Sequence, residues 1–188
     1  MNQSLRLAVL AGAAFVLAGC HLGSGLPVYG RVPKFDLVRE SGQPFDQTDV
    51  AGRVWVANFF FTSCHGPCPR MSAQMKQLQK TFEDADDVAL VSFTIDPNTD
   101  TPEVLRKYGE RLGAIPGRWF FVTGEPRELR KLSKDTFFLN DIGPPFEHST
   151  RFVLIDKQER IRGFYDSSDP DAIKDLVGHI RELQDEKM

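Results

Sequence analysis

The strongest constraint on the fold is the apolar stretch over residues 54–62 (VWVANFFFT). Neighbouring side chains of a strand point to opposite faces, so a strand with this composition has to be covered on both sides. Residues 88–95 (VALVSFTI) repeat the pattern, and residues 118–123 (RWFFVT) form a third candidate strand. The sequence therefore predicts a mostly parallel sheet that is buried between layers of helices.

Helical segments separate these strands. The first follows Pro67 and ends near residue 82, and its residues Met71 and Met75 recur at helical spacing, which predicts that both belong to the core rather than to a metal site. Proline and capping residues predict further helices over about 101–112, 125–134 and 169–184.

Two hairpins flank this alternating region. Residues 34–38 and 43–46 suggest an N-terminal β-hairpin, and residues 151–156 and 160–165 suggest an antiparallel pair near the end of the chain. The element order predicts an α/β fold of the thioredoxin-like type, with a mixed central sheet flanked by helices and an added N-terminal β-hairpin.

The N-terminus has the features of a targeting segment. Residues 7–17 (LAVLAGAAFVL) are apolar but too few to span a bilayer, and they lead into Leu17-Ala18-Gly19-Cys20, which resembles a lipoprotein cleavage site. We expect residues 1–19 to be a signal peptide, Cys20 to carry lipid, and residues 20–33 to be a flexible linker. The folded domain is expected over 34–188, lipid-anchored on the periplasmic side of a bacterial membrane.

Charge and cysteine content narrow the function. A net charge of −3 without a dense basic patch excludes nucleic acid as a partner class. The chain has three cysteines, and an odd number in an exported protein needs an explanation. If lipid occupies Cys20, one pair remains, Cys64 and Cys68.

This pair lies in the segment FTSCHGPCP, between the strongest strand and a helix start. Two cysteines four apart at a helix start are expected on one face, and the helix amides there are expected to lower the thiol pKa values. Such thiolates suit attack on disulfides or binding of soft Cu(I). An inert structural disulfide is the alternative, although it would close only a very short loop.

Two thiolates leave a copper site incomplete, so a histidine is expected as the third ligand. Among the four histidines, His21 lies in the linker, His179 is expected on a helix surface, and His65 is expected to point away from the cysteines. His148 precedes the predicted strand at 151–156, beside the cysteine loop in a thioredoxin-like fold. Position alone leaves open whether it is a ligand or a surface or capping histidine.

Three ordered motifs, VANFFFTSCxxxCP, FTIDPNTDTPEVLRKYGERLG and HSTRFVLID, resemble the Sco/SenC family of copper chaperones over residues 34–185. The resemblance implies that Cys64, Cys68 and His148 bind copper, as Cu(I) or Cu(II). It also implies assistance to the dinuclear copper site of cytochrome c oxidase, by copper delivery, thiol reduction or both. The implied partners are the copper-binding oxidase subunit, other periplasmic copper chaperones or thiol reductases, and the membrane through the anchor.

The chain departs from the family pattern at His65, where a proline often follows the first cysteine. It also departs from thioredoxins, because Ser149-Thr150 replaces their cis-proline, which argues against a general disulfide reductase. A thiol–disulfide oxidoreductase with Cys64 as nucleophile, a peroxidase, and a redox or copper sensor remain alternatives. Asp96 either shapes the site or serves only the Asp-Pro turn.

Overall fold

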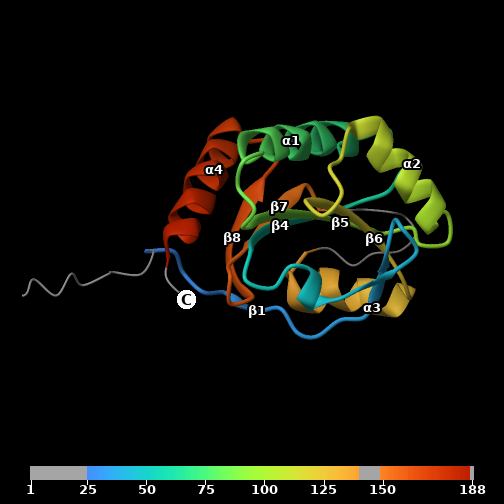
Figure 1. Cartoon of the computed structure of the whole chain (residues 1–188), viewed down its shortest axis with the longest axis horizontal. Helices are drawn as coiled ribbons and strands as arrows, with labels where there is room; N and C mark the ends of the chain where they lie inside the picture. Colours follow the sequence, from blue (N-terminus) through green and yellow to red (C-terminus); the bar gives the residue numbers. More distant parts are fainter. Residues whose placement is uncertain (1–24, 140–148, 187–188) are drawn as a thin grey trace, which may run out of the picture.

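The computed structural model describes residues 25–139 and 149–186. Eight strands form one sheet in the order β1-β8-β7-β4-β5-β6-β2-β3 (Figure 1). The strands are β1 (Gly30–Arg31), β2 (Leu37–Arg39), β3 (Pro44–Phe45), β4 (Val54–Phe60), β5 (Val88–Thr94), β6 (Trp119–Thr123), β7 (Arg151–Ile155) and β8 (Arg160–Asp166). The helices are α1 (Cys68–Thr81), α2 (Pro102–Leu112), α3 (Pro126–Lys131) and α4 (Pro170–Asp185), with short helical turns at Gln47–Asp49 and Leu132–Thr136.

The centre of the sheet is parallel and its margins are antiparallel. Strands β4, β5 and β6 run in the same direction, while β7 pairs with β4 and with β8 in the opposite direction. The predicted N-terminal hairpin is confirmed as β2–β3, and β2 extends the sheet by pairing with β6. The mixed thioredoxin-like sheet that the sequence predicts is therefore present.

Each face of β4 packs into a separate hydrophobic core. Helices α1, α2 and α4 cover one face of the sheet, and α3 covers the other (Figure 1). The alternation within β4 sends Val54, Val56 and Phe60 to the first core and Trp55, Ala57 and Phe59 to the second. Met71 and Met75 of α1 are fully buried in the first core, as predicted.

The ordered domain begins before Lys34. The stretch expected to be a linker includes β1, which pairs with β8, and the buried side chain of Val32. The predicted signal peptide and Cys20 lie outside the described residues. Within 25–139 and 149–186, no helix is both long and apolar enough to cross a membrane.

Strand β8 meets α4 at a close contact that needs a glycine. Gly163 and Tyr165 share one face of β8, and a Cβ atom at position 163 would lie 2.7 Å from the Cε2 atom of the Tyr165 ring. The ring cannot swing away freely, because its hydroxyl is hydrogen-bonded to Nδ1 of His179 in α4 at 2.8 Å.

We therefore predict that Gly163→Ala lowers the free energy of unfolding by about 1–3 kcal/mol, because the added methyl overpacks this contact. Gly178→Ala in α4 is the matched control, since a Cβ there meets no atom within 4 Å. It should raise the free energy of unfolding by about 0.5–1 kcal/mol through helix propensity. Urea unfolding measures both, and equal effects of the two changes would contradict the packing.

Candidate dithiol site

The two cysteines lie where the chain leaves β4 and enters α1. Cys68 is the first residue of α1, and Pro67 occupies the N-cap position. Cys64 lies in the preceding loop, where its N–H donates to the carbonyl of Phe61 at 3.2 Å. The site is therefore at the carboxyl end of a central parallel strand, which is where α/β sheets place ligands. The expectation that both cysteines share a helix face is wrong, because the helix starts only at the second one.

The two side chains nevertheless meet. Both sulfurs are thiols, and the thiol of Cys68 is hydrogen-bonded with that of Cys64. Cys68 is 1% exposed, whereas Cys64 is half-buried. The loop thus presents one sulfur toward solvent and keeps the other in the core, in direct contact.

Burial raises the pKa of the Cys68 thiol, and the hydrogen bond with Cys64 raises it further. Backbone hydrogen bonds from Phe61 and from Cys68 itself act in the opposite direction but do not outweigh the burial. The expectation that the helix start lowers the pKa is therefore wrong for Cys68. Desolvation of a thiolate in the core exceeds the stabilisation that the helix amides supply.

A buried carboxylate holds the loop against the sheet. Asp100 accepts from the N–H of Thr62 at 3.1 Å and from the hydroxyl of the same residue. It also accepts from Oγ1 of Thr94 at 2.5 Å. Because Thr62 follows β4 and Thr94 ends β5, one side chain joins the carboxyl ends of two neighbouring strands. From the sequence, Asp100 is expected only to follow a strand end near the site, and the signal that could have shown its role is the pair of threonines at matching strand ends.

Asp96 serves the turn that carries this carboxylate. Its carbonyl accepts from the N–H groups of Thr99 at 3.1 Å and Asp100 at 2.9 Å. Its own N–H donates to Oγ1 of Thr94 at 3.0 Å. These contacts agree with the turn interpretation of Asp96.

Tyr108 of α2 is a further residue near the dithiol that sequence reasoning missed. Its ring packs on Phe60 with centroids 5.3 Å apart, and its hydroxyl lies 2.9 Å from Oγ of Ser72 in α1. Burial raises the pKa of Tyr108, and electrostatic interaction with Cys68 and Cys64 adds to the shift. Tyr108 is therefore a neutral phenol that lies within electrostatic range of the two sulfurs.

Neither histidine in the described part of the chain completes the site. Within residues 25–139 and 149–186, no three His, Cys, Asp or Glu side chains are grouped so that they could hold a metal ion. His65 is exposed, and His179 is bonded to Tyr165. His148 and His21 lie outside the described residues, so the structure leaves the predicted third ligand as an expectation.

The chain next to position 148 is tied to the start of α1. The carbonyl of Thr150 accepts from the N–H of Ser167 at 2.9 Å. Ser167 in turn accepts from Arg70 at 3.3 Å through its hydroxyl and from Gln74 at 2.9 Å through its carbonyl. Both donors belong to the first turns of the helix that begins at Cys68.

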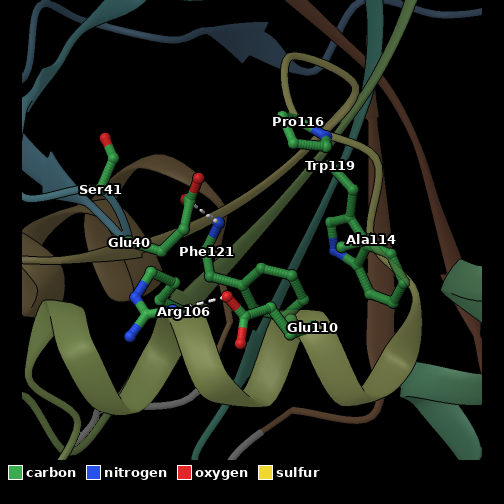
Figure 2. A pocket seen from close by; sticks show the side chains of 9 residues that line it. Glu40, Ser41, Arg106, Glu110, Ala114, Pro116, Trp119 and Phe121 are labelled. Carbon is green, nitrogen blue, oxygen red and sulfur yellow. Dashed lines mark hydrogen bonds and ion pairs between the residues drawn. The ribbon is translucent and has the colours of Figure 1, made fainter.

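A separate hollow of about 260 Å³ lies between α2 and the edge of β6 (Figure 2). Trp119 and Phe121 contribute apolar surface, and the carboxylate of Glu40 accepts from the N–H of Phe121 at 3.0 Å. At the rim, Arg106 is paired with Glu110 at 2.6 Å. The residues that line it are Glu40, Ser41, Arg106, Gly109, Glu110, Ala114, Pro116, Trp119 and Phe121. It contains neither thiol nor imidazole and does not belong to the dithiol site.

We predict that Asp100→Ala lowers the free energy of unfolding by about 2–4 kcal/mol, because buried donors at Thr62 and Thr94 lose their acceptor. Asp96→Ala is the control, since its backbone contacts survive the change, and it should cost less than about 1 kcal/mol. Equal losses in urea unfolding would show that Asp100 does not hold the two strand ends together.

The difference in exposure predicts different thiol reactivity. In the reduced native chain, iodoacetamide should alkylate Cys64 at least about tenfold faster than Cys68 near neutral pH, because Cys68 is buried and its pKa is raised. Mass spectrometry of peptides after timed quenching measures each rate separately. The difference between the two rates should persist into the mildly alkaline range, because burial keeps the pKa of the Cys68 thiol well above its ordinary value. Equal rates at neutral pH would contradict the asymmetric pair.

Comparison with known proteins agrees with this geometry. The sequence profile described as SCO1/SenC matches residues 29–184. A protein of Stutzerimonas stutzeri, named as a candidate copper-binding protein, is 32% identical over 152 residues, which cover 73% of this chain and 70% of that protein.

Two solved structures share the fold. A SCO1/SenC family lipoprotein from Bacillus anthracis is 32% identical with a TM-score of 0.75, covering 83% of this chain and 96% of that one. BsSco, described as a Sco family member with a disulfide switch, is 25% identical with a TM-score of 0.74, covering 84% of this chain and 96% of its own. The chain therefore belongs to the SCO1/SenC family of cytochrome c oxidase assembly proteins and has their thioredoxin-like fold.

Proposed function

We propose that this protein is a membrane-tethered copper chaperone that binds copper through Cys64, Cys68 and His148. It would deliver the metal to the dinuclear copper site of cytochrome c oxidase. The observation that carries the proposal is the contact between the two thiols at the carboxyl end of β4. Thiolates are the preferred ligands of Cu(I), and homologues in the family bind copper.

The surroundings of the pair suit a soft metal more than a solvated cation. Cys68 is buried, and the neutral phenol of Tyr108 and the ring of Phe60 lie beside it. A thiol whose pKa is raised gives up its proton when a metal takes its place, so copper binding should release protons and tighten as the pH rises. The ion would replace these protons between two sulfurs that already touch.

Two observations support His148 as the third ligand. Neither His65 nor His179 joins the cysteines within the described residues. In addition, the bond from Ser167 to the carbonyl of Thr150 fixes the chain two residues after His148 beside the first turns of α1. Because two residues reach at most about 7 Å, this anchoring of Thr150 supports His148 as a ligand near Cys68. An imidazole nitrogen is also a suitable ligand for Cu(II), so the site would accept copper in either oxidation state.

The thiol contact also makes the site sensitive to oxidation. Oxidation would join the two sulfurs and release two protons and two electrons to an acceptor, which removes both thiolate ligands at once. BsSco is described as containing a disulfide switch. We propose that copper binding here requires the reduced pair, so that the redox state of the compartment gates loading.

A thiol–disulfide oxidoreductase is the second candidate, and the unequal exposure of the cysteines favours it. Cys64 is accessible enough to attack a disulfide, and Cys68 is positioned to resolve the mixed disulfide. The same chemistry could reduce cysteines of the oxidase subunit before copper is delivered. The two roles differ in their need for His148, because disulfide exchange requires no third ligand.

The tether and the partner complete the proposal. We propose that Cys20 carries lipid and holds the domain on the periplasmic side of a bacterial membrane. The relative from Bacillus anthracis is described as a lipoprotein. The client would be the copper-binding oxidase subunit, with transfer by exchange of ligands between this site and cysteines and histidines of that subunit.

We predict that the reduced chain binds one copper ion and that Cys64→Ser or Cys68→Ser weakens Cu(I) affinity by more than about 100-fold, because each removes a thiolate ligand. His148→Ala should change the Cu(II) absorption and electron paramagnetic resonance spectra, since a nitrogen ligand is lost. Competition with a chromogenic Cu(I) chelator measures the affinities.

His179→Ala is the matched control, because this histidine is bonded to Tyr165 and lies in α4. It should leave affinity and spectra unchanged. If the reduced chain binds no copper above background, the chaperone proposal fails. If His148→Ala and His179→Ala give the same spectra, the third ligand is assigned wrongly.

A further inference from the structure

Most of the exposed large apolar side chains in the described part of the chain gather at one place. Val28, Tyr29 and Phe138 are 54%, 53% and 58% exposed. They form, with the half-buried Phe164, what we call the aromatic patch. The ring of Tyr29 meets the ring of Phe164 edge-on with centroids 5.2 Å apart, and the ring of Phe138 also meets Phe164 edge-on with centroids 6.5 Å apart.

The patch lies at the antiparallel margin of the sheet. Gly30 of β1 pairs with Ile161 of β8, and a Cβ at Gly30 would lie 3.7 Å from the Phe138 ring, so the segments around residues 28–30 and 138 touch. Phe164 packs against the core on the α3 face. Exposed aromatic and apolar groups of this kind mark a surface that contacts a membrane or another protein.

The chain leading to the patch is fixed to the domain. Arg162, which is 2% exposed at its side chain, donates to the carbonyl of Leu26 at 3.0 Å and to that of Pro27 at 3.3 Å. The same guanidinium is paired with Asp156 at 2.7 Å and Glu186 at 2.8 Å, which hold it in place. The N–H of Gly25 donates to Glu182 of α4 at 3.0 Å. Residues 25–29 therefore move with the domain and do not act as a free linker.

This attachment shortens the tether. Cys20 and Gly25 are five residues apart in the sequence, and five residues span at most about 18 Å. A lipid on Cys20 would therefore keep the start of the docked chain close to the bilayer surface. Tyr29 and Val28 follow within a few residues of that point, on the part of the domain that is drawn toward the membrane first.

We propose that the aromatic patch sits in the interfacial layer of the bilayer and fixes the orientation of the domain on the membrane. The proposal rests on the lipid anchor at Cys20, which is part of the proposed function. Tyrosine and other rings with an apolar body favour the headgroup boundary, and an apolar contact beside a lipid anchor adds a second membrane-binding signal. Residues 25–29 and the aromatic patch then hold the domain in one orientation on the bilayer. The orientation of the dithiol relative to the membrane is therefore constant.

The test uses the full lipidated chain in vesicles of phosphatidylethanolamine and phosphatidylglycerol whose acyl chains are brominated. Tryptophan is introduced by Tyr29→Trp or Phe138→Trp, and Ile115→Trp is the matched control. Ile115 is 42% exposed but lies between α2 and β6, away from the patch. The native residues Trp55 and Trp119 are buried and supply a constant background.

The brominated lipid should quench the tryptophan added at position 29 or 138 by about half or more, and should leave the one at position 115 near background. Equal quenching at all three positions overturns the proposal. Protection of positions 29 and 138 from aqueous iodide without quenching by lipid also overturns it, because protein would then cover the patch.

Copper binding is measured on the same samples to separate two failures. If the chain binds copper but lipid does not quench the added tryptophan, the proposed contact of the aromatic patch with the membrane is wrong and the chaperone function stands. If the chain does not stay with the vesicles, both the lipid anchor and the membrane contact of the aromatic patch are wrong. If lipid quenches tryptophan in the patch but the chain binds no copper, the membrane contact stands and the proposed copper function is wrong.

Discussion

Burial of both faces of β4 is the constraint on which the rest of the structure depends. The strand alternates between two cores, so helices have to cover the sheet on either side and β5 and β7 have to flank it. A strand held in this way ends at a fixed point. The loop with Cys64 and Cys68 leaves from that point, and Asp100 secures it by joining the ends of β4 and β5. The reactive pair is therefore positioned by a loop that is anchored at the ends of two fully buried strands.

Much of the fold could be predicted, because each element carries its own local signal. Within the described residues, every main helix and strand except β1 is predicted by an apolar run, a helix start at proline or one of the two hairpins. The pairing of β2 with β6 could not be read from local periodicity, because it joins segments far apart in the sequence. The docked stretch at 25–33 was expected to be a linker from its glycines and prolines. Its contacts depend on Arg162, whose buried position is decided only by the folded sheet.

The dithiol was also predictable only in part. The location of Cys64 and Cys68 follows from strand and helix signals, but their chemistry depends on burial. Helix amides favour a thiolate, whereas the surrounding core disfavours it, and the second effect is larger at Cys68. A buried thiol with a raised pKa is a poor nucleophile until a base accepts its proton, and it becomes a metal ligand when a metal ion displaces that proton. Cys68 is therefore shielded from external disulfides and well suited to hold a soft ion, while Cys64 keeps the access that exchange with a partner requires.

The central claim is that the reduced pair is a copper ligand set, and X-ray absorption at the copper edge tests it most directly. We expect the Cu(I)-loaded reduced chain to show two sulfur scatterers in the first shell, and the Cu(II)-loaded chain to show two sulfurs with at least one nitrogen from imidazole. A first shell of oxygen and nitrogen without sulfur would contradict the claim, because copper would then be bound elsewhere on the protein.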